Sequence, residues 1–204
     1  MSKLTRIPNA KGIQPLRARG VENVGVTHVG GVVLAAGAGT RYGMPKVLAG
    51  GGQWLRAAVS ALYDGGCDDI VVVLGAAVVD VPAPARAVVA GDWADGMSAS
   101  LRAGISALQP GSTDYAVVLT VDTPDIGAAA VRRVLDAALT SSSGIARARY
   151  GERPGHPVVI ARAHWPQLLA TVRGDEGARS FLAARDDVVL ADCEDLATGT
   201  DIDE

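Results

Sequence analysis

Apolar residues set the rhythm of this sequence. From Gly31 onward, short runs rich in valine, isoleucine and alanine alternate with longer stretches whose apolar residues recur every three or four positions. The short runs are typical of strands buried on both faces, and the longer stretches are typical of amphipathic helices. The alternation therefore predicts an α/β fold built on a mostly parallel sheet.

Seven strands and five helices follow from this pattern. The predicted strands are Gly31–Ala36, Asp69–Leu74, Ala87–Ala90, Tyr115–Val121, Ile145–Tyr150, Val158–Ala161 and Val188–Ala191. The predicted helices are Trp54–Tyr63, Ser98–Leu108, Gly127–Thr140, Arg162–Thr171 and Glu176–Ala184. Because 49 % of the residues are apolar but only 4 % are aromatic, the core must pack small aliphatic side chains between helices and sheet. This predicts a three-layer sandwich.

Charge and cysteine content exclude several classes of function. The formal net charge is -3, with no basic tract, so we expect no nucleic-acid partner. Cys67 and Cys193 are the two cysteines, and neither belongs to a zinc-binding or disulfide-rich pattern. We therefore expect a protein of the reducing cytoplasm. No apolar run in residues 1–30 is long enough for a secretory signal or a membrane span, and we expect no membrane partner.

The chain is expected to form one domain after a leader. Residues 1–30 contain scattered prolines and glycines, which predict a flexible N-terminal leader. Residues 31–204 have the length of a single domain. The "TSSSG" stretch at residues 140–144 is the clearest loop signal, and it divides that domain into a half of residues 31–140 and a half of residues 145–204.

The loop after the first predicted strand is the main candidate for a ligand site. "LAAGAGTRYGMPK", residues 34–46, runs from the strand into Gly37, Gly39 and Gly43. Loops at the carboxyl ends of the strands are where α/β sheets bind ligands. Glycines there can take positive φ values and let backbone N–H groups approach an anion. We expect a phosphate-binding loop, although a tight turn with solvated cations has the same composition.

The spacing of this loop departs from two common phosphate-binding motifs. A Walker A loop has Ser or Thr after its lysine, whereas Val47 follows Lys46. The dinucleotide fingerprint has its third glycine three positions after the second, whereas Gly43 lies four after Gly39. The loop instead carries Arg41 and Lys46, whose two charges suit a nucleoside triphosphate.

This thirteen-residue stretch resembles the N-terminal signature of the molybdenum cofactor nucleotidyltransferases, and specifically of their cytidylyltransferase branch. The resemblance implies a Rossmann-like nucleotidyltransferase fold, with nucleotide bound by residues 31–140 and acceptor by residues 145–204. It also implies that Arg41 and Lys46 are catalytic. The residues of this stretch that it assigns to nucleotide binding are Leu34, Ala35, Ala36, Gly37, Gly39, Thr40, Arg41 and Lys46.

"DWADGMSASLRAG", residues 92–104, resembles a second stretch of the same family, which lies beside the nucleotide. Gly96 would allow a close approach of the backbone, and Ser98 would cap the helix that it opens. The N-terminus of that helix would face an anion. We expect Gly96 and Ser98 to contact the nucleotide.

"VVLTVDTPD", residues 117–125, places Asp122 directly after a buried strand. The local pattern alone is also typical of a strand-end turn. In the family that it resembles, this aspartate binds Mg²⁺, a cation that prefers carboxylate and phosphate oxygens. We therefore expect Asp122 to be a catalytic metal ligand, and Asp125 to be a helix cap.

Two stretches resemble the part of the family that holds the pterin acceptor. "GHPVVI", residues 155–160, would fix His156 in a turn, and "GDEGARSFL", residues 174–182, contains Asp175 and Arg179. The resemblance implies that these three side chains bind the acceptor. A structural histidine and a helix-surface ion pair or cap are the alternatives for them.

The last residues, "TGTDIDE", resemble the start of a family segment that supplies a second metal ligand, with Asp201 and Asp203 as the candidates. That segment is cut short here, and the family's asparagine near the Trp93 motif is replaced by Ala90. A catalytically inactive nucleotide- or cofactor-binding relative is therefore one alternative. A guanylyltransferase, or an NTP transferase with another phosphorylated acceptor, is the other.

The resemblance implies a Mg²⁺-dependent transfer of CMP from CTP to molybdopterin, with release of pyrophosphate. Alanine at position 36 goes with CTP in this family, and glycine goes with GTP. The implied partners are the small molecules CTP (or GTP) and molybdopterin, and a molybdoenzyme or its chaperone that receives the product.

Overall fold

The computed structural model describes residues 26–202. Most of the predicted leader and Asp203 lie outside this range. None of the helices within it is long and apolar enough to cross a membrane.

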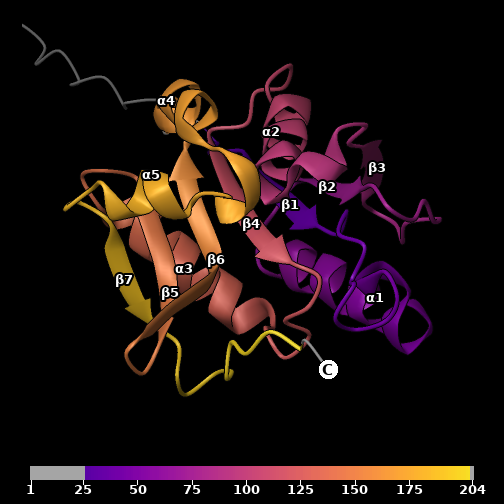
Figure 1. The fold of residues 1–204 in the computed structure, drawn as a ribbon. Coiled ribbons are helices and arrows are strands. Elements are labelled where there is room, and N and C mark those ends of the chain that lie inside the picture. The colour runs from indigo at the N-terminus through magenta and orange to yellow at the C-terminus, as the bar shows by residue number, and fades with distance from the viewer. Residues whose placement is uncertain (1–25, 203–204) are drawn as a thin grey trace, which may run out of the picture.

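Seven strands form one sheet in the order β3-β2-β1-β4-β6-β5-β7 (Figure 1). Their bounds are β1 Val29–Leu34, β2 Asp69–Leu74, β3 Arg86–Val89, β4 Tyr115–Thr120, β5 Ile145–Tyr150, β6 Arg153–Ala161 and β7 Val189–Asp192. Strand β6 pairs antiparallel with both β4 and β5, and the other pairings are parallel. The predicted mostly parallel sheet is confirmed, and it runs without interruption through both halves of the chain.

Five α-helices cover the two faces of this sheet. They are α1 Ala49–Asp64, α2 Met97–Leu108, α3 Ala128–Thr140, α4 Trp165–Thr171 and α5 Arg179–Ala183. Helices α1 and α3 bury apolar side chains against one face, and α2, α4 and α5 bury theirs against the other (Figure 1). Valine, leucine, isoleucine and alanine make up most of both clusters, as the composition predicts. The three-layer α/β sandwich is thereby confirmed.

Two of the seven predicted strands were wrong by two residues or more. β1 begins at Val29 and ends at Leu34, two residues before the predicted range. Ala35 and Ala36 are nevertheless buried, which is why the apolar pattern continues past the strand. β6 begins at Arg153 rather than Val158, so it includes the Gly-His-Pro stretch.

The last two predicted helices are interrupted. The first turn of the predicted helix Arg162–Thr171 is a 3₁₀ turn, and α4 follows it. The predicted helix Glu176–Ala184 is shorter because Gly177 has φ 54°, a left-handed conformation that a helix cannot contain. Gly177 packs against Met97, where a Cβ would lie 2.8 Å from the methionine sulfur. A 3₁₀ turn, Gly174–Glu176, precedes it and α5 follows it.

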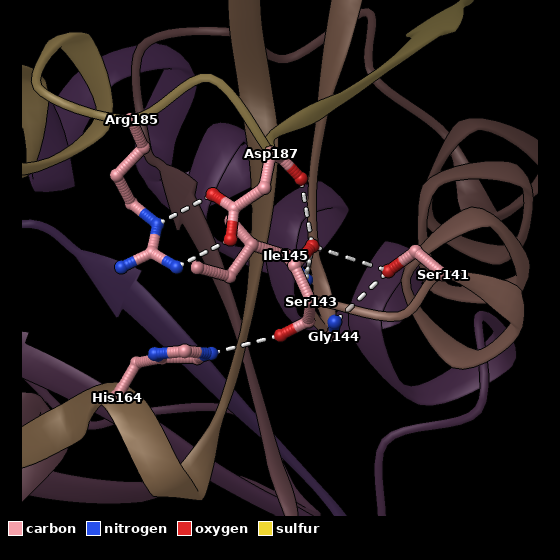
Figure 2. Close-up of polar contacts among 7 residues, drawn as sticks. All are labelled: Ser141, Ser143, Gly144, Ile145, His164, Arg185 and Asp187. Atoms are coloured by element: carbon pink, nitrogen blue, oxygen red, sulfur yellow. Dashed lines mark hydrogen bonds and ion pairs between the residues drawn. The ribbon is translucent and has the colours of Figure 1, made fainter.

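The "TSSSG" stretch is a loop, as predicted, and side-chain hydrogen bonds hold it in place (Figure 2). Ser143 Oγ donates to the carbonyl oxygen of Asp187 over 2.7 Å, and Ser141 Oγ accepts from the Gly144 N–H over 2.9 Å. The His164 ring also contacts the Ser143 carbonyl oxygen, at 2.8 Å. The loop thereby ties α3 and β5 to the segment that leads into β7.

Candidate functional site

The site lies where the strand order reverses direction. β2 pairs with one side of β1 and β4 with the other, and Leu34 at the end of β1 is opposite Thr120 at the end of β4. The loops that leave these two ends are joined by a 3.1 Å hydrogen bond from the Val121 N–H to the Leu34 carbonyl oxygen. A topological switch point of this kind opens a crevice at the carboxyl edge of the sheet.

A cavity of about 390 Å³ occupies this crevice. Most of the residues that the sequence assigns to the nucleotide line it, and Asp122 lies at its base after β4. The predicted residues in its wall are Leu34, Ala35, Ala36, Gly37, Gly39, Thr40, Arg41, Lys46, Gly96, Asp122 and Asp175. The structure therefore brings together the loop after β1, the start of α2 and the end of β4.

Two of the three loop glycines are needed for their backbone conformation. Gly39 has φ 60° and Gly43 has φ 84°. A Cβ on Gly39 would lie 2.0 Å from the carbonyl oxygen of Met44, so the loop closes too tightly for any side chain there. The prediction of positive φ was wrong for Gly37, which has none and has no atom within 4 Å of its ideal Cβ position.

Lys46 and Asp122 form a partly buried ion pair in this cavity. Lys46 Nζ donates to Asp122 Oδ2 over 2.9 Å, and the two side chains are only 13 % and 22 % exposed. The second carboxylate oxygen, Asp122 Oδ1, is buried and has no hydrogen-bond partner among residues 26–202. An orphaned carboxylate oxygen at such a position is costly, and it suits a cation as its partner.

Asp122 would need further oxygens to hold a metal ion. Across residues 26–202, no group of three or more His, Cys, Asp or Glu side chains is placed to bind one. Asp201 comes near through the backbone, because the N–H of the next residue, Ile202, donates to the Asp122 carbonyl oxygen over 3.0 Å. A hard cation such as Mg²⁺ commonly completes its shell with substrate phosphates and water.

The start of α2 differs from its prediction. The helix begins at Met97 with Gly96 as its N-cap, so Ser98 does not cap it. The Ser98 hydroxyl is buried without a hydrogen-bond partner, and it is Ser100 that lines the cavity. Ser100 lies four residues after Gly96 and hence on the same face of the helix, a spacing that could have identified it. A Cβ on Gly96 would lie 2.5 Å from Asp175 Oδ1, so this glycine lets the Asp175 turn pack against α2.

Asp125 also plays a different part from the predicted helix cap. Gly127 is the N-cap of α3. Asp125 Oδ2 instead accepts hydrogen bonds from the Thr198 N–H and hydroxyl, each over 2.7 Å. Asp125 therefore anchors the segment that brings Asp201 to the site.

The predicted acceptor residues are divided between two cavities. Asp175 lines the first cavity, whereas His156, Arg179 and Asp201 line a second cavity of about 710 Å³ beside β5, β6 and α5. Asp175 and Arg179 cannot pair as helix neighbours because Gly177 breaks the helix between them. Within residues 26–202, no ion pair joins them.

His156 lines the second cavity and is partly buried. It lies in strand β6, so the predicted turn at this residue was wrong. Burial and, to a smaller extent, the charge of Arg147 lower the pKa of His156 to about 4, while the charge of Asp122 opposes the shift. The imidazole is therefore neutral at pH 7. Tyr150 donates a 2.7 Å hydrogen bond to the His156 carbonyl oxygen and fixes the backbone there.

Sequence reasoning missed three arginines of the second cavity. Arg147, Arg153 and Arg185 line it together with the predicted Arg179. The signal for the first was present in "IARARY", residues 145–150, where arginines alternate with small apolar residues. On a strand, that alternation places the arginines together on one face.

Known proteins are similar to this chain in sequence and in fold. Residues 31–188 match the family model of the MobA-like NTP transferase domain. Nicotine blue oxidoreductase of Paenarthrobacter nicotinovorans is 38 % identical over 192 residues, which cover 86 % of this chain and 92 % of that relative.

The solved structures agree with the family match. Rv0371c from Mycobacterium tuberculosis H37Rv has a TM-score of 0.66 and 27 % identity, and the match covers 81 % of this chain and 88 % of that one. Its manganese complex has a TM-score of 0.62 and 26 % identity, with the same coverage. The 2-C-methyl-D-erythritol 4-phosphate cytidylyltransferase of Thermus thermophilus shares the fold at 21 % identity, with a TM-score of 0.60 over 86 % of this chain and 93 % of that one. This chain thus belongs to the MobA-like NTP transferase family and has its nucleotidyltransferase fold.

Proposed function

We propose that this nucleotidyltransferase moves CMP from CTP onto the terminal phosphate of molybdopterin and releases pyrophosphate. The observation that carries the proposal is the Lys46–Asp122 ion pair at the base of a cavity walled by a glycine loop. A cation and a carboxylate held together in a crevice at the sheet edge suit a reaction whose substrates are phosphates and whose metal ion is divalent.

The first cavity would hold the triphosphate. Backbone N–H groups of the loop after β1 would hold phosphate oxygens, as would the N-terminus of α2 at Gly96. Arg41 and Lys46 would neutralise the charge that builds up on the departing pyrophosphate. Nucleotidyl transfer depends mainly on such positioning and charge stabilisation, so it needs no covalent help from the protein.

Asp122 would hold the metal ion, with Asp201 and Asp203 as further candidates. The orphaned Asp122 Oδ1 fits a hard divalent cation, and Mg²⁺ is the cation proposed here. The manganese complex of Rv0371c supports a divalent ion in a relative of this fold. When bound, such an ion supplies positive charge to phosphate oxygens. Lys46 would then donate to phosphate oxygens as well as to Asp122.

The second cavity would hold the acceptor, with His156 and Arg179 as binding residues. His156 and Arg147 line this cavity, and the charge of Asp122 in the first cavity acts on His156, so a phosphate bound in the second cavity would lie near the triphosphate. Asp175, in the wall of the first cavity, would contact the substrates from the α2 side. The attacking group is a phosphate oxygen that is already ionised at pH 7. The neutral His156 is therefore not needed as a base, and it would orient the acceptor by hydrogen bonding.

Ala36 supports CTP as the nucleotide. It is buried in the cavity wall, and its carbonyl oxygen accepts a 2.9 Å hydrogen bond from the Ala76 N–H, which fixes the loop against β2. A methyl group at this place can exclude a larger purine base by contact. The product would pass to a molybdoenzyme or its chaperone in the cytoplasm.

A second candidate is oxidoreduction, because the relative with 38 % identity is named nicotine blue oxidoreductase. Such an activity would need a two-electron donor, for example a reduced nicotinamide dinucleotide, in the first cavity. The loop spacing does not match the dinucleotide-binding fingerprint, because Gly43 lies four rather than three residues after Gly39. This argues against a nicotinamide dinucleotide as the donor. The Lys46–Asp122 pair likewise suits phosphates and a metal ion better than hydride transfer.

A paired assay separates these functions. Purified protein is given Mg²⁺ and molybdopterin with CTP, GTP or ATP, and pyrophosphate release is measured. In parallel, it is given reduced nicotinamide dinucleotide and a heteroaromatic dye, and loss of the reduced cofactor is followed. The proposal predicts pyrophosphate release that is fastest with CTP and no dye reduction. Dye reduction without pyrophosphate release would establish the oxidoreductase, and CTP binding without either reaction would establish the inactive relative.

A further inference from the structure

The second cavity carries an excess of positive charge that the protein itself leaves only partly balanced. Four arginines and one aspartate line it: Arg147, Arg153, Arg179, Arg185 and Asp201. Two of the arginines have partners of their own. Arg185 donates to both carboxylate oxygens of Asp187, over 2.8 and 2.6 Å, as Figure 2 shows. Arg153 reaches the Thr198 carbonyl oxygen and the Thr200 hydroxyl at 3.5 and 3.4 Å.

Arg147 and Arg179 are the unbalanced pair. No carboxylate within residues 26–202 forms an ion pair with either guanidinium. Arg147 makes one weak contact, 3.5 Å from its Nη2 to the Gly155 carbonyl oxygen, and its Nε is buried without a partner. Burial lowers the pKa of Arg147, and the neighbouring charge of Arg179 lowers it further. Arg147 and Arg179 line the same cavity, so an anion bound there would interact favourably with both guanidinium groups.

Apolar side chains complete the wall on the β7 side. Leu182, Val188 and Leu190 line the same cavity, and Leu190 is 51 % exposed although its neighbour Ala191 is buried. An anion bound by the two guanidinium groups would thus have room for an apolar or planar body beside it. Arginine suits this task because its planar fork can donate two parallel hydrogen bonds to a phosphate.

We infer that Arg147 is a specificity-determining residue that, together with Arg179, selects an acceptor bearing a phosphomonoester and rejects a neutral acceptor of the same shape. The inference deepens the proposed function and rests on it, because a phosphate bound in this cavity is an acceptor only if the protein transfers a nucleotide. It assigns the role to a strand residue, Arg147, that lines the same cavity as His156. It also sets this cavity apart from one suited to an uncharged acceptor.

Phenyl phosphate is a suitable probe, with phenol as its neutral counterpart. Its binding is measured by titration calorimetry and by the Nε–H signals of arginine in nitrogen-labelled protein. The wild type is expected to bind phenyl phosphate and not phenol, and the Arg147 Nε–H signal is expected to shift on binding. Arg147→Gln should weaken binding about tenfold or more, because a charged hydrogen-bond pair is lost.

Matched variants control for charge, folding and the other phosphate site. Arg86→Gln removes the same charge from β3 at the far edge of the sheet, where Arg86 pairs with exposed Asp69, and should leave binding unchanged. Lys46→Ala removes a phosphate-binding charge from the first cavity, and it should also leave the binding of phenyl phosphate unchanged. Arg179→Gln, at an exposed position, should weaken binding even if Arg147→Gln fails to fold.

Several outcomes would overturn the inference. The wild type would fail to bind phenyl phosphate, or would bind phenol as tightly as phenyl phosphate. Alternatively, the Gln variants of Arg147 and Arg179 would bind phenyl phosphate as tightly as the wild type, or Lys46→Ala alone would lose that binding. CTP binding is measured on the same samples. If CTP fails to bind while Arg147-dependent phosphate binding persists, the nucleotidyl transfer proposal fails and the anion site remains. If CTP binds and Arg147→Gln binds phenyl phosphate as tightly as the wild type, the inferred anion site fails and the nucleotidyl transfer proposal remains.

Discussion

Lys46 donates a 2.9 Å hydrogen bond to Asp122 across 76 residues of sequence. The lysine closes the glycine loop after β1, and the aspartate follows β4, the strand that pairs with β1. The fold thereby joins the two groups to which the proposed transfer assigns the phosphates and the metal ion. Each prediction below depends on this junction or on the cavities beside it.

Removing either partner should nearly abolish activity. Lys46→Ala and Asp122→Asn are each expected to lower the turnover number for pyrophosphate release by about a hundredfold or more, because charge stabilisation in such sites has this magnitude. Asp136→Asn is the matched control, since Asp136 is an exposed carboxylate on α3 that lines neither cavity. The turnover number of this control should stay within a few-fold of the wild-type value. Equal losses in all three variants would indicate damage to the fold rather than a role in the reaction.

Two glycines of the same loop should respond differently to one methyl group. Gly39→Ala would place a Cβ 2.0 Å from the Met44 carbonyl oxygen at a φ of 60°, so the loop must open. CTP affinity should fall at least about tenfold, and thermal unfolding should occur at lower temperature. Gly37→Ala meets no atom within 4 Å and should retain the wild-type melting temperature. Thermal melts and CTP titrations test this, and a wild-type response of Gly39→Ala would refute the strained-loop account.

Ala36→Gly should change the choice of base. The buried methyl group of Ala36 narrows the cavity wall. Its removal is expected to raise GTP affinity relative to CTP by about tenfold, the order of discrimination that one methyl contact provides. Competition titrations with both nucleotides and Mg²⁺ measure the ratio. An unchanged ratio would show that the base is selected elsewhere in the cavity.

His156 should make the protein less stable in mild acid. Burial lowers its pKa from an ordinary value of 6.5 to about 4 in the folded protein. Between these values the unfolded chain takes up a proton that the folded protein does not, so the free energy of unfolding falls as the pH drops from about 6.5 to 4. The loss is at most about 3 kcal/mol.

Denaturant unfolding of wild type and His156→Gln across that pH range isolates this contribution. The variant lacks the titrating group, so its stability should fall less steeply with acid, although other carboxylates contribute to both curves. Above pH 7 the two curves should run parallel. The same slope in both proteins below pH 6.5 would contradict the assignment of a partly buried imidazole that is neutral in the folded protein.

The sequence predicted the sheet and the first cavity well because both depend on local patterns. Apolar periodicity located six of the seven strands to within two residues, and β6 begins five residues before its predicted start. The glycine loop and Asp122 meet because parallel strands end at one edge. Boundaries shifted where burial continues beyond the hydrogen-bonded strand, as at Ala35 and Ala36, or where a left-handed glycine such as Gly177 interrupts a helical pattern.

The second cavity was harder to predict because it depends on contacts between distant segments. Arg147 and Arg179 come from a strand and a helix, and their proximity cannot be read from spacing. Asp125 was expected to cap a helix, but its partner Thr198 lies 73 residues away.

Ser98 fits a helix cap by its position in the sequence, yet the helix begins one residue earlier, at Met97.

The most direct test of nucleotidyl transfer follows the α-phosphorus of the nucleotide. CTP labelled at that atom is incubated with the wild-type protein, Mg²⁺ and molybdopterin, and the products are separated by chromatography and identified by mass. The account predicts that the label moves to the pterin as a dinucleotide, with one pyrophosphate released for each product, and that Asp122→Asn forms none. Label that stays in CTP or appears only as free CMP, while the pterin is recovered unchanged, would contradict it.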